Sequence, residues 1–297
     1  MKLGIDVGGT LTKVAVIDGH LSIQYSRSSP TVAGREAFPL FISSLIREAM
    51  ASFPAIQSVG IGIPGKIDTV HGNIVCCPAL QIENMNLCTI LRQACDLPVF
   101  IDNDVNVWAL AEQAVGCCRD AESYVLITIG TGIGAGIVIG GQIYRGHNFE
   151  AGEIGYMVSE EDYDHPCPSK TDFGPFERRA SAIAVSNRYN QATGDRVDTR
   201  EVFRRALQDG EPLALRLVGE QMKALAVGIS NIICILQPQK VVIGGGLAGE
   251  GEYLTENLNR YVRRLIPTEV PVVLSQAGKW GGAIGAALAG ENEVETE

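Results

Sequence analysis

The chain of 297 residues is long enough for two domains of ordinary size, and with 46% hydrophobic and 20% charged residues it is expected to be globular and well cored. Its net charge of −10 excludes a general basic surface for a nucleic acid or a membrane. The eight cysteines form no C-x-x-C pair and no apolar leader opens the chain, which favours reduced thiols in the cytoplasm.

The first elements expected along the chain are a strand, a glycine turn and a second strand, in "LGIDVGGTLTKVAVID". A third strand is expected in "LSIQYSRSS", followed by helical spacing from about Gly34 to Phe53. "SVGIGIPG" predicts a short buried strand. "PVFIDNDVNVWALAEQAVG" predicts a strand that runs into a helix.

The same order then restarts in "SYVLITIGTGIGAGIVIGGQIYRG". Its uncharged part, Leu126 to Tyr144, contains six glycines, so strands and turns are predicted there rather than a membrane span. A long helix around Leu213 to Leu236, a strand in "KVVIGGGLAG", a small-residue helix in "KWGGAIGAALAG" and a frayed acidic tail complete the chain. Two copies of one unit predict two related α/β domains with a ligand-binding cleft between them.

Three glycine-rich turns end predicted strands: Gly8-Gly9-Thr10, Gly130-Thr131-Gly132 and Gly244-Gly245-Gly246. Each alone is most simply an ordinary turn, but together they favour a nucleotide phosphate site, because exposed N–H groups bind anions. Gly130, Gly132 and Ala135 also fit the dinucleotide fingerprint G-x-G-x-x-A. That fingerprint requires a helix directly afterwards, and here a strand is expected, so we interpret the match as accidental.

Three polar residues stand where the strand of "FIDNDVNVWA" runs into its helix. Asp102 or Asn103 is needed as the helix N-cap. Asp104 is a candidate general base, with Asn103 orienting a substrate hydroxyl, and the pattern leaves capping and catalysis equally open. For Glu150 and Glu153 a solvated loop is the default interpretation.

Glu177 lies near a predicted helix start, where the helix dipole alone would explain an acidic residue. Arg178 and Arg179 are expected to face solvent.

These pieces together resemble the ROK family of sugar kinases and repressors, in the actin-like ATPase superfamily, from Leu3 to about Leu288. The segments that carry the resemblance are "IDVGGTLTK", "GIGIPGKID", "DNDVNVWALAE", "GTGIGAGIVIGGQIYRG…AGEIGYM" and "VVIGGGL". The resemblance implies an α/β fold of two related actin-like ATPase (ribonuclease H-like) domains with the active site in the cleft between them. The expected division is residues 1–112 plus 283–297 and residues 113–282.

The resemblance also implies roles for individual residues. Asp104 matches the catalytic base, and Asp6 faces Mg²⁺ through water or phosphate. Residues that match contacts to ATP are Gly8, Gly9, Thr10, Lys13, Gly130, Thr131, Gly132, Gly244, Gly245 and Gly246. Residues that match the sugar pocket are Gly65, Asn103, Asp104, Glu153, Tyr156 and Glu177. The implied cofactors are ATP and Mg²⁺.

The sequence departs from the family pattern after Tyr156. The family has a histidine at that position, and a following cysteine cluster that binds zinc with it. Here Pro168, Lys170 and Pro175 fall at the cysteine positions, so no zinc site is expected. The loop is expected to be held by packing of Tyr156, Phe173 and Phe176, with Pro166, Pro168 and Pro175 limiting its freedom. The tyrosine is similar to the branch that includes β-glucoside kinases.

The resulting hypothesis is an ATP-dependent kinase that phosphorylates a hydroxyl, expected to be the 6-hydroxyl, of a hexose or hexose glycoside. The alternatives are a sugar-sensing transcriptional regulator and a non-catalytic sugar-binding protein. A regulator needs an additional basic DNA-binding segment, and the first strand already begins at Leu3. We expect a cytoplasmic homodimer that binds a small sugar and neither nucleic acid nor membrane.

Overall fold

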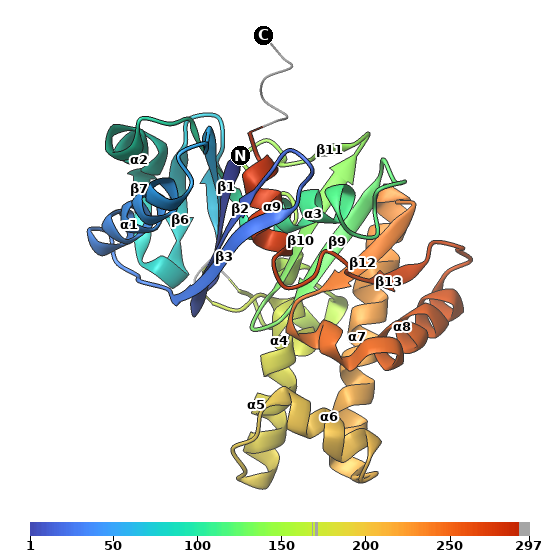
Figure 1. Ribbon diagram of the computed structural model, residues 1–297. Helices are drawn as coiled ribbons and strands as arrows, with labels where there is room; N and C mark the ends of the chain where they lie inside the picture. The colour runs from blue at the N-terminus through green and yellow to red at the C-terminus, as the bar shows by residue number, and fades with distance from the viewer. Residues whose placement is uncertain (168, 170–171, 291–297) are drawn as a thin grey trace. The chain divides into compact units, whose positions relative to one another are not determined.

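The computed structural model describes residues 1–167, 169 and 172–290, and its chain divides into two compact units (Figure 1). Unit 1 comprises Met1–Glu122, Gly136–Ala151 and the described residues from Gln276 onward. Unit 2 comprises Ser123–Ala135 and Gly152–Ser275. The predicted fraying of the acidic tail concerns residues that lie outside this description.

The main sheet of unit 1 has the strand order β3-β2-β1-β4-β8. Strand β1 pairs antiparallel with β2 and parallel with β4. A second, three-stranded sheet has the order β5-β6-β7. The strands are β1 (Lys2–Val7), β2 (Leu11–Ile17), β3 (Ile23–Pro30), β4 (Ser58–Ile63), β5 (Lys66–Asp68), β6 (Asn73–Cys77), β7 (Ile82–Asn86) and β8 (Val99–Asn103). The helices are α1 (Ala37–Ser52), η1 (Pro78–Leu80), α2 (Leu87–Cys95), α3 (Asp104–Ala114) and α9 (Gly281–Leu288).

The two faces of the main sheet are covered by different helices. Leu3, Ile5 and Val7 of β1 are fully buried in one cluster with the apolar residues of α1 and α2. Successive residues of a strand point to opposite faces, so Gly4 lies on the other face. There a Cβ on Gly4 would lie 1.8 Å from the carbonyl oxygen of Ala283, which shows how closely α9 packs on β1. The small-residue composition of α9 permits this contact, as predicted.

Most of a second five-stranded sheet belongs to unit 2, together with the helices between residues 154 and 265, whereas the part of the sheet within Gly136–Ala151 belongs to unit 1. The sheet order is β11-β10-β9-β12-β13, in which β12 is parallel to both β9 and β13. The strands are β9 (Tyr124–Ile129), β10 (Ile133–Ile139), β11 (Gln142–Ile143), β12 (Lys240–Gly244) and β13 (Val272–Leu274). The helices are η2 (Ile154–Tyr156), η3 (Glu160–Asp162), α4 (Pro175–Ala180), α5 (Ala182–Thr193), α6 (Thr199–Leu207), α7 (Pro212–Leu236), η4 (Gly246–Glu250) and α8 (Gly251–Leu265).

The two main sheets have equivalent strand orders. In each, three strands that follow one another in the chain lie side by side, and two later strands continue the sheet. This confirms the sequence prediction that the strand–turn–strand pattern is repeated. The predicted strands of Leu126 to Tyr144 are β9, β10 and β11, also as expected. The three-stranded sheet and the helices α2, α5, α6 and α8 were not predicted, although the apolar residues of α6 and α8 recur at helical spacing.

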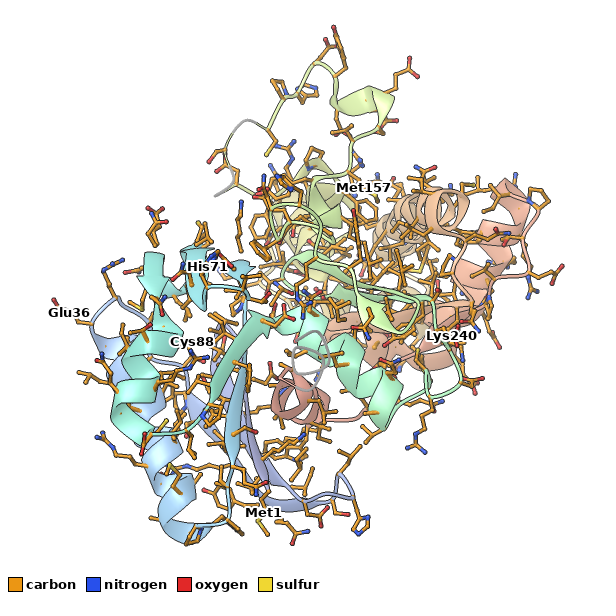
Figure 2. The ribbon with its side chains drawn as sticks, turned by 90° about the horizontal axis from the view of Figure 1, so that it is seen from above. Met1, Glu36, His71, Cys88, Met157 and Lys240 are labelled. Carbon is orange, nitrogen blue, oxygen red and sulfur yellow. The ribbon has the colours of Figure 1, made fainter. Side chains whose placement is uncertain are left out.

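Helix α7 packs against α4, α5, α6 and α8, as Figure 1 shows. Of the described helices it alone is long and apolar enough to cross a membrane, yet 56% of its most apolar segment is buried inside the protein. The cysteines form no disulfide among the described residues, and Cys88, at the start of α2, is buried (Figure 2).

Candidate active site

The first glycine turn, Gly8-Gly9-Thr10, connects β1 to β2 and is held by Thr31. The amide of Gly8 donates to the carbonyl of Leu11 at 3.0 Å, which closes the turn. The hydroxyl of Thr31 donates to the carbonyl of Gly8 at 2.7 Å, and its amide donates to that of Thr10 at 2.9 Å. Gly9 and Thr10 remain exposed, so the turn presents its tip to solvent on a fixed base.

Asp6 and Lys13 lie opposite each other on β1 and β2, directly beside this turn. The Lys13 Nζ and Asp6 Oδ2 atoms are 3.4 Å apart. Burial raises the pKa of Asp6, and the nearby ammonium of Lys13 opposes that shift. Gly282, in the first turn of α9, contacts the same carboxylate, because a Cβ there would lie 2.5 Å from the Asp6 Cγ. The predicted nucleotide residues of unit 1 therefore form one group.

Asn103 ends β8 and caps α3. Its Oδ1 accepts hydrogen bonds from the amides of Val105 and Asn106, at 2.8 and 3.3 Å. Its Nδ2 donates to the carbonyl of Gly65 at 3.0 Å. The cap that the sequence required is thus Asn103 and not Asp102. Asp104, the first residue of α3, is half-buried beside it, and its Oδ1 accepts from the Val105 amide at 3.1 Å.

Asp102 belongs to a buried ion pair that the sequence did not reveal. Its side chain is 2% exposed, and its Oδ2 accepts from Arg145 Nε at 3.0 Å and Nη2 at 2.6 Å. Its Oδ1 accepts from the Asn103 amide at 2.7 Å and from Asn106 Nδ2 at 2.9 Å. A two-pronged guanidinium–carboxylate pair fixes direction as well as distance. It therefore holds the segment that carries Asn103 and Asp104.

The second glycine turn, Gly130-Thr131-Gly132, connects β9 to β10. A strand follows it, so the match to the dinucleotide fingerprint is accidental, as predicted. The amide of Ile133 donates to Glu177 Oε1 at 2.8 Å, and the amide of Ala182 donates to the Gly130 carbonyl at 2.9 Å. Both ends of the turn are thus bonded to the segment around α4.

Glu177 brings the predicted sugar residues of unit 2 close to this turn. Its Oε2 accepts from the amide of Gly174 at 2.9 Å, which caps α4. Its side chain also fills the space beside Gly155, where a Cβ would lie 2.5 Å from the Glu177 Cγ. Gly155 belongs to η2, which begins after the exposed Glu153 and ends at Tyr156. Burial raises the pKa of Tyr156, and the Glu177 charge adds to this.

The third glycine turn follows β12 and lies beside the end of β9. Gly245 has a φ of +80°, and a Cβ there would meet the Ile129 carbonyl oxygen at 2.6 Å, so no other residue fits. Gly244 and Gly246 flank it, and Ile129 directly precedes the second turn. The second and third turns, predicted to contact the nucleotide, are therefore neighbours in unit 2.

Three expectations about loops and charged residues were wrong. Phe173 is 45% exposed and does not hold the loop after Tyr156, whereas Phe176 is 4% exposed. Arg179 does not face solvent alone: it pairs with Asp162 and lowers the pKa of that carboxyl to about 2. Glu150 was expected to be simply solvated, but its Oε1 atom lies 3.5 Å from Lys66 Nζ and forms an ion pair with it.

The remaining predictions about this loop can be located only in part. Pro168 and Lys170 lie outside the described residues. Within the described ranges, no group of three or more His, Cys, Asp or Glu residues is placed to hold a metal ion.

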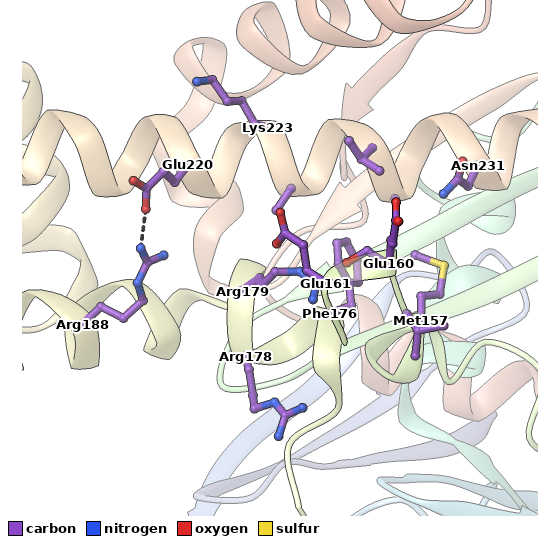
Figure 3. Close-up of a pocket in the computed structure, with 15 residues that line it drawn as sticks. Met157, Glu160, Glu161, Phe176, Arg178, Arg179, Arg188, Glu220, Lys223 and Asn231 are labelled. Carbon is purple, nitrogen blue, oxygen red and sulfur yellow. Dashed lines mark hydrogen bonds and ion pairs between the residues drawn. The ribbon is translucent and has the colours of Figure 1, made fainter. Parts of the chain in front are cut away.

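A cavity of about 700 Å³ lies in unit 2 between α7 and the segment of Met157 to Glu161 (Figure 3). Figure 3 shows Met157 and Phe176 on its apolar side and the ion pair of Arg188 with Glu220 at one end. None of the residues predicted to bind sugar or nucleotide lines this cavity.

Comparison with known proteins places this architecture in a family. The ROK family model matches residues 2–292, and the chain belongs to the ROK family. A β-glucoside kinase from Listeria innocua is 30% identical over 262 residues, which cover 86% of each chain. The structure is similar to a ROK family glucokinase from Streptomyces griseus in complex with glucose and AMPPNP, with a TM-score of 0.82, 26% identity and 98% and 99% of the two chains covered.

A ROK family transcriptional regulator, a homologue of the E. coli MLC protein, has the same fold. Its TM-score is 0.83 at 24% identity, and the match covers 97% of this chain and 77% of that one. The likeness to this regulator shows the shared fold alone, whereas the β-glucoside kinase relative supports a sugar kinase.

Proposed function

We propose that the protein is an ATP-dependent sugar kinase, which transfers the γ-phosphoryl group to a hydroxyl of a hexose or hexose glycoside. The observation that carries the proposal is the arrangement at the β8–α3 junction. Asn103 caps the helix and bonds to Gly65, and Asp102 is paired with Arg145, so these contacts fix the position of the neighbouring Asp104, whose Oδ1 accepts from the Val105 amide at 3.1 Å. A partly exposed carboxylate on a rigid base suits a general base.

In the proposed reaction the Asp104 carboxylate takes the proton of the sugar hydroxyl. The hydroxyl oxygen bonds to the γ-phosphorus, and the bond from that phosphorus to the β–γ bridging oxygen breaks, which releases ADP. Asn103 and the neighbouring Gly65 would orient the sugar. Glu153 and Tyr156, with Glu177 beside them, are also proposed as part of the sugar-binding group, as the family resemblance implies. Most of the rate would come from positioning and charge stabilisation.

The glycine turns would bind the phosphates of ATP through backbone N–H groups. The segments proposed for this role are Gly8 to Thr10 with Lys13, Gly130 to Gly132, and Gly244 to Gly246. Glycines allow a phosphate to approach the main chain closely, and N–H groups that converge on an anion need no reorganisation when charge develops.

Asp6 suits a magnesium site of the type that kinases use. Mg²⁺ is commonly held by one or two carboxylates, phosphate oxygens and water rather than by a cage of protein ligands. Asp6 is a single, largely buried carboxylate with a raised pKa, beside a lysine and a phosphate-type turn. When bound, the ion neutralises charge on the phosphate oxygens. Asp6 would hold it directly or through water.

The acceptor is proposed to be the 6-hydroxyl of a glucose-like sugar or its glycoside. The similarity to a β-glucoside kinase supports this class. Tyr156 replaces the family histidine and would shape the same part of the sugar site. A homodimer in the cytoplasm is proposed from the family resemblance alone.

A coupled ADP-release assay over glucose, mannose, fructose, N-acetylhexosamines and β-glucosides tests the proposal. We expect one class to raise ADP release well above the rate without sugar, and mass spectrometry to find the matching sugar phosphate. Tight binding of a sugar with no sugar-dependent ADP from any compound would contradict catalysis and favour the regulator or a sugar-binding protein.

A further inference from the structure

Glu177 has the geometry of a link between two ligand sites rather than of a residue that serves one. Its two carboxylate oxygens bond to different segments. Oε1 accepts from the amide of Ile133, 44 residues away and directly after the second glycine turn. Oε2 accepts from the amide of Gly174, at the start of its own helix. A shift of the turn therefore changes a bond to α4.

The carboxylate also fills the space between two glycines from different segments. A Cβ on Gly132, in the turn, would lie 2.5 Å from Oε1. A Cβ on Gly155, in η2, would lie 2.5 Å from Cγ and 2.6 Å from Cδ. Separations this short do not occur for real side chains, so both positions have to be glycine while Glu177 stays where it is. The glutamate thus touches the proposed phosphate turn on one side and the proposed sugar segment on the other.

Helix α4 is bonded to the same two segments at its two ends. Before its start, the hydroxyl of Tyr156 donates to the carbonyl of Asp172 at 3.2 Å. A Cβ on Gly174 would lie 2.2 Å from the carbonyl oxygen of Gly155. After its end, the amide of Ala182 donates to the carbonyl of Gly130 at 2.9 Å. A helix of six residues held at both ends moves as one body.

From these contacts we infer that Glu177 is a positioning residue that couples sugar binding to nucleotide binding within unit 2. Sugar bound at Glu153 and Tyr156 orders η2 and α4, and through Glu177 it fixes the Ile133 amide and the Gly130 to Gly132 turn in the phosphate-binding arrangement. Coupling of this kind is reciprocal, so ATP raises the affinity for sugar by the same factor. The inference rests on the proposed function, since it assigns the two segments to sugar and phosphate.

The test measures the dissociation constant of the best sugar from the ADP-release screen, by calorimetry, with and without AMPPNP and Mg²⁺. In the wild type we expect a ratio of the two constants between about 5 and 150, the usual range of coupling between sites. Glu177→Gln can keep only one of its two backbone bonds, because its NH₂ group cannot accept. The ratio should therefore fall towards one. Gly132→Ala should lower it as well, through its clash with Oε1.

Glu201→Gln is the matched control, because Glu201 lies on α6 and pairs only with arginines there. It should leave the ratio unchanged. A wild-type ratio of one, or a ratio that Glu177→Gln leaves unchanged, would overturn the inference. Loss of sugar affinity by the same factor with and without AMPPNP would also overturn it, because that pattern is expected of a simple sugar contact.

A second measurement uses only the wild-type protein, in case the variants do not fold. Hydrogen exchange at the Ile133 amide should slow when sugar binds without any nucleotide. Unchanged exchange at saturating sugar would contradict the link. If the protein binds neither sugar nor nucleotide, the proposed function itself fails, and this outcome is distinct from the others.

Discussion

The first and second glycine turns occupy equivalent places in their sheets but are held in different ways. Gly8 to Thr10 is held by the neutral side chain and main chain of Thr31, whose hydroxyl also bonds to the Thr12 hydroxyl at 2.9 Å. Gly130 to Gly132 is held by Glu177 and Ala182, which lie on the segment that also contacts η2. The repeated fold therefore supports one turn independently and couples the other to a neighbouring site.

The same difference applies to the residues proposed to contact the sugar. In unit 1, Asn103 and Asp104 are supported by the ion pair of Asp102 with Arg145, which is separate from Thr31. In unit 2, Glu177 supports both the turn and η2. A change in unit 1 should consequently affect one step or one ligand at a time, whereas a change at Glu177 should affect both ligands.

The largest expected effect is that of Asp104→Asn, which removes the proposed base and should leave both ligands bound. The turnover number should fall by roughly 10²- to 10⁴-fold, the usual contribution of a positioned base, with little change in the dissociation constants of sugar and AMPPNP. Steady-state kinetics and calorimetry measure the two parts. Asp96→Asn is the control, because Asp96 has a φ of +52° that asparagine also tolerates. Near wild-type turnover in Asp104→Asn would show that another group is the base.

A smaller effect is expected from Arg145→Lys, which keeps the charge and loses the two-pronged pair with Asp102. Hydrogen bonds to charged groups contribute about 1.5–3 kcal/mol, so kcat/KM for the sugar should fall roughly 10- to 10²-fold. The KM for ATP should stay within about twofold, because Thr31 supports the first turn separately. Arg27→Lys, in an exposed pair with Glu48, should change neither. Equal losses for both substrates would contradict the separation within unit 1.

Thr31→Val should affect ATP and not the sugar, the opposite of Arg145→Lys, and its effect should be smaller. It removes the hydroxyl that donates to the Gly8 carbonyl, a loss of about 0.5–1.5 kcal/mol. We expect the KM for ATP to rise by roughly two- to tenfold and the KM for sugar to stay constant. Thr31→Ser, which keeps the hydroxyl, should restore the KM for ATP. A change in sugar KM alone would mean that the first turn does not belong to the nucleotide site.

The smallest expected effect is the low reactivity of the Cys77 thiol in the wild-type protein, which reports on the packing of unit 1. Burial raises the pKa of the Cys77 thiol to about 11, so the reactive thiolate appears only as the pH approaches that value. At pH 8 about one Cys77 in a thousand is ionised, as the difference from its pKa requires. Iodoacetamide labelling followed by mass spectrometry should therefore modify the exposed Cys234 long before Cys77. The charge of Asp104 also raises the Cys77 pKa, so equal labelling rates would show that the part of unit 1 around these two residues is not rigid.

The local parts of the fold and of the site could be predicted because their signals are local. Strand β1, the turn after it and strand β2 follow from apolar runs broken by glycines, and the Asn103–Asp104 pair stands out where an apolar strand meets a helix. The repeat of strand, turn and strand was visible in the second half for the same reason. The glycine turns indicate strand ends from the local sequence alone, without information about distant residues.

The supports of the site could not be predicted, because each joins residues far apart in the chain. Arg145 lies 43 residues after Asp102, Thr31 lies 23 residues after Gly8, and Ile133 lies 44 residues before Glu177. One weak signal existed: Arg145 is the first charged residue after the uncharged stretch that ends at Tyr144. A charge directly after a core strand needs a partner, but the sequence does not say which one.

Transfer of a labelled phosphoryl group tests the central claim most directly. The protein is incubated with Mg²⁺, ATP carrying ³²P in its γ-phosphate and each sugar of the panel, and the products are separated by chromatography. The proposed kinase predicts that one sugar class acquires the label in equal amount to the ADP formed, and that Asp104→Asn abolishes most of this transfer while Asp96→Asn does not. Release of labelled inorganic phosphate alone, or no release of label at all in the presence of a sugar that demonstrably binds, would contradict the proposal.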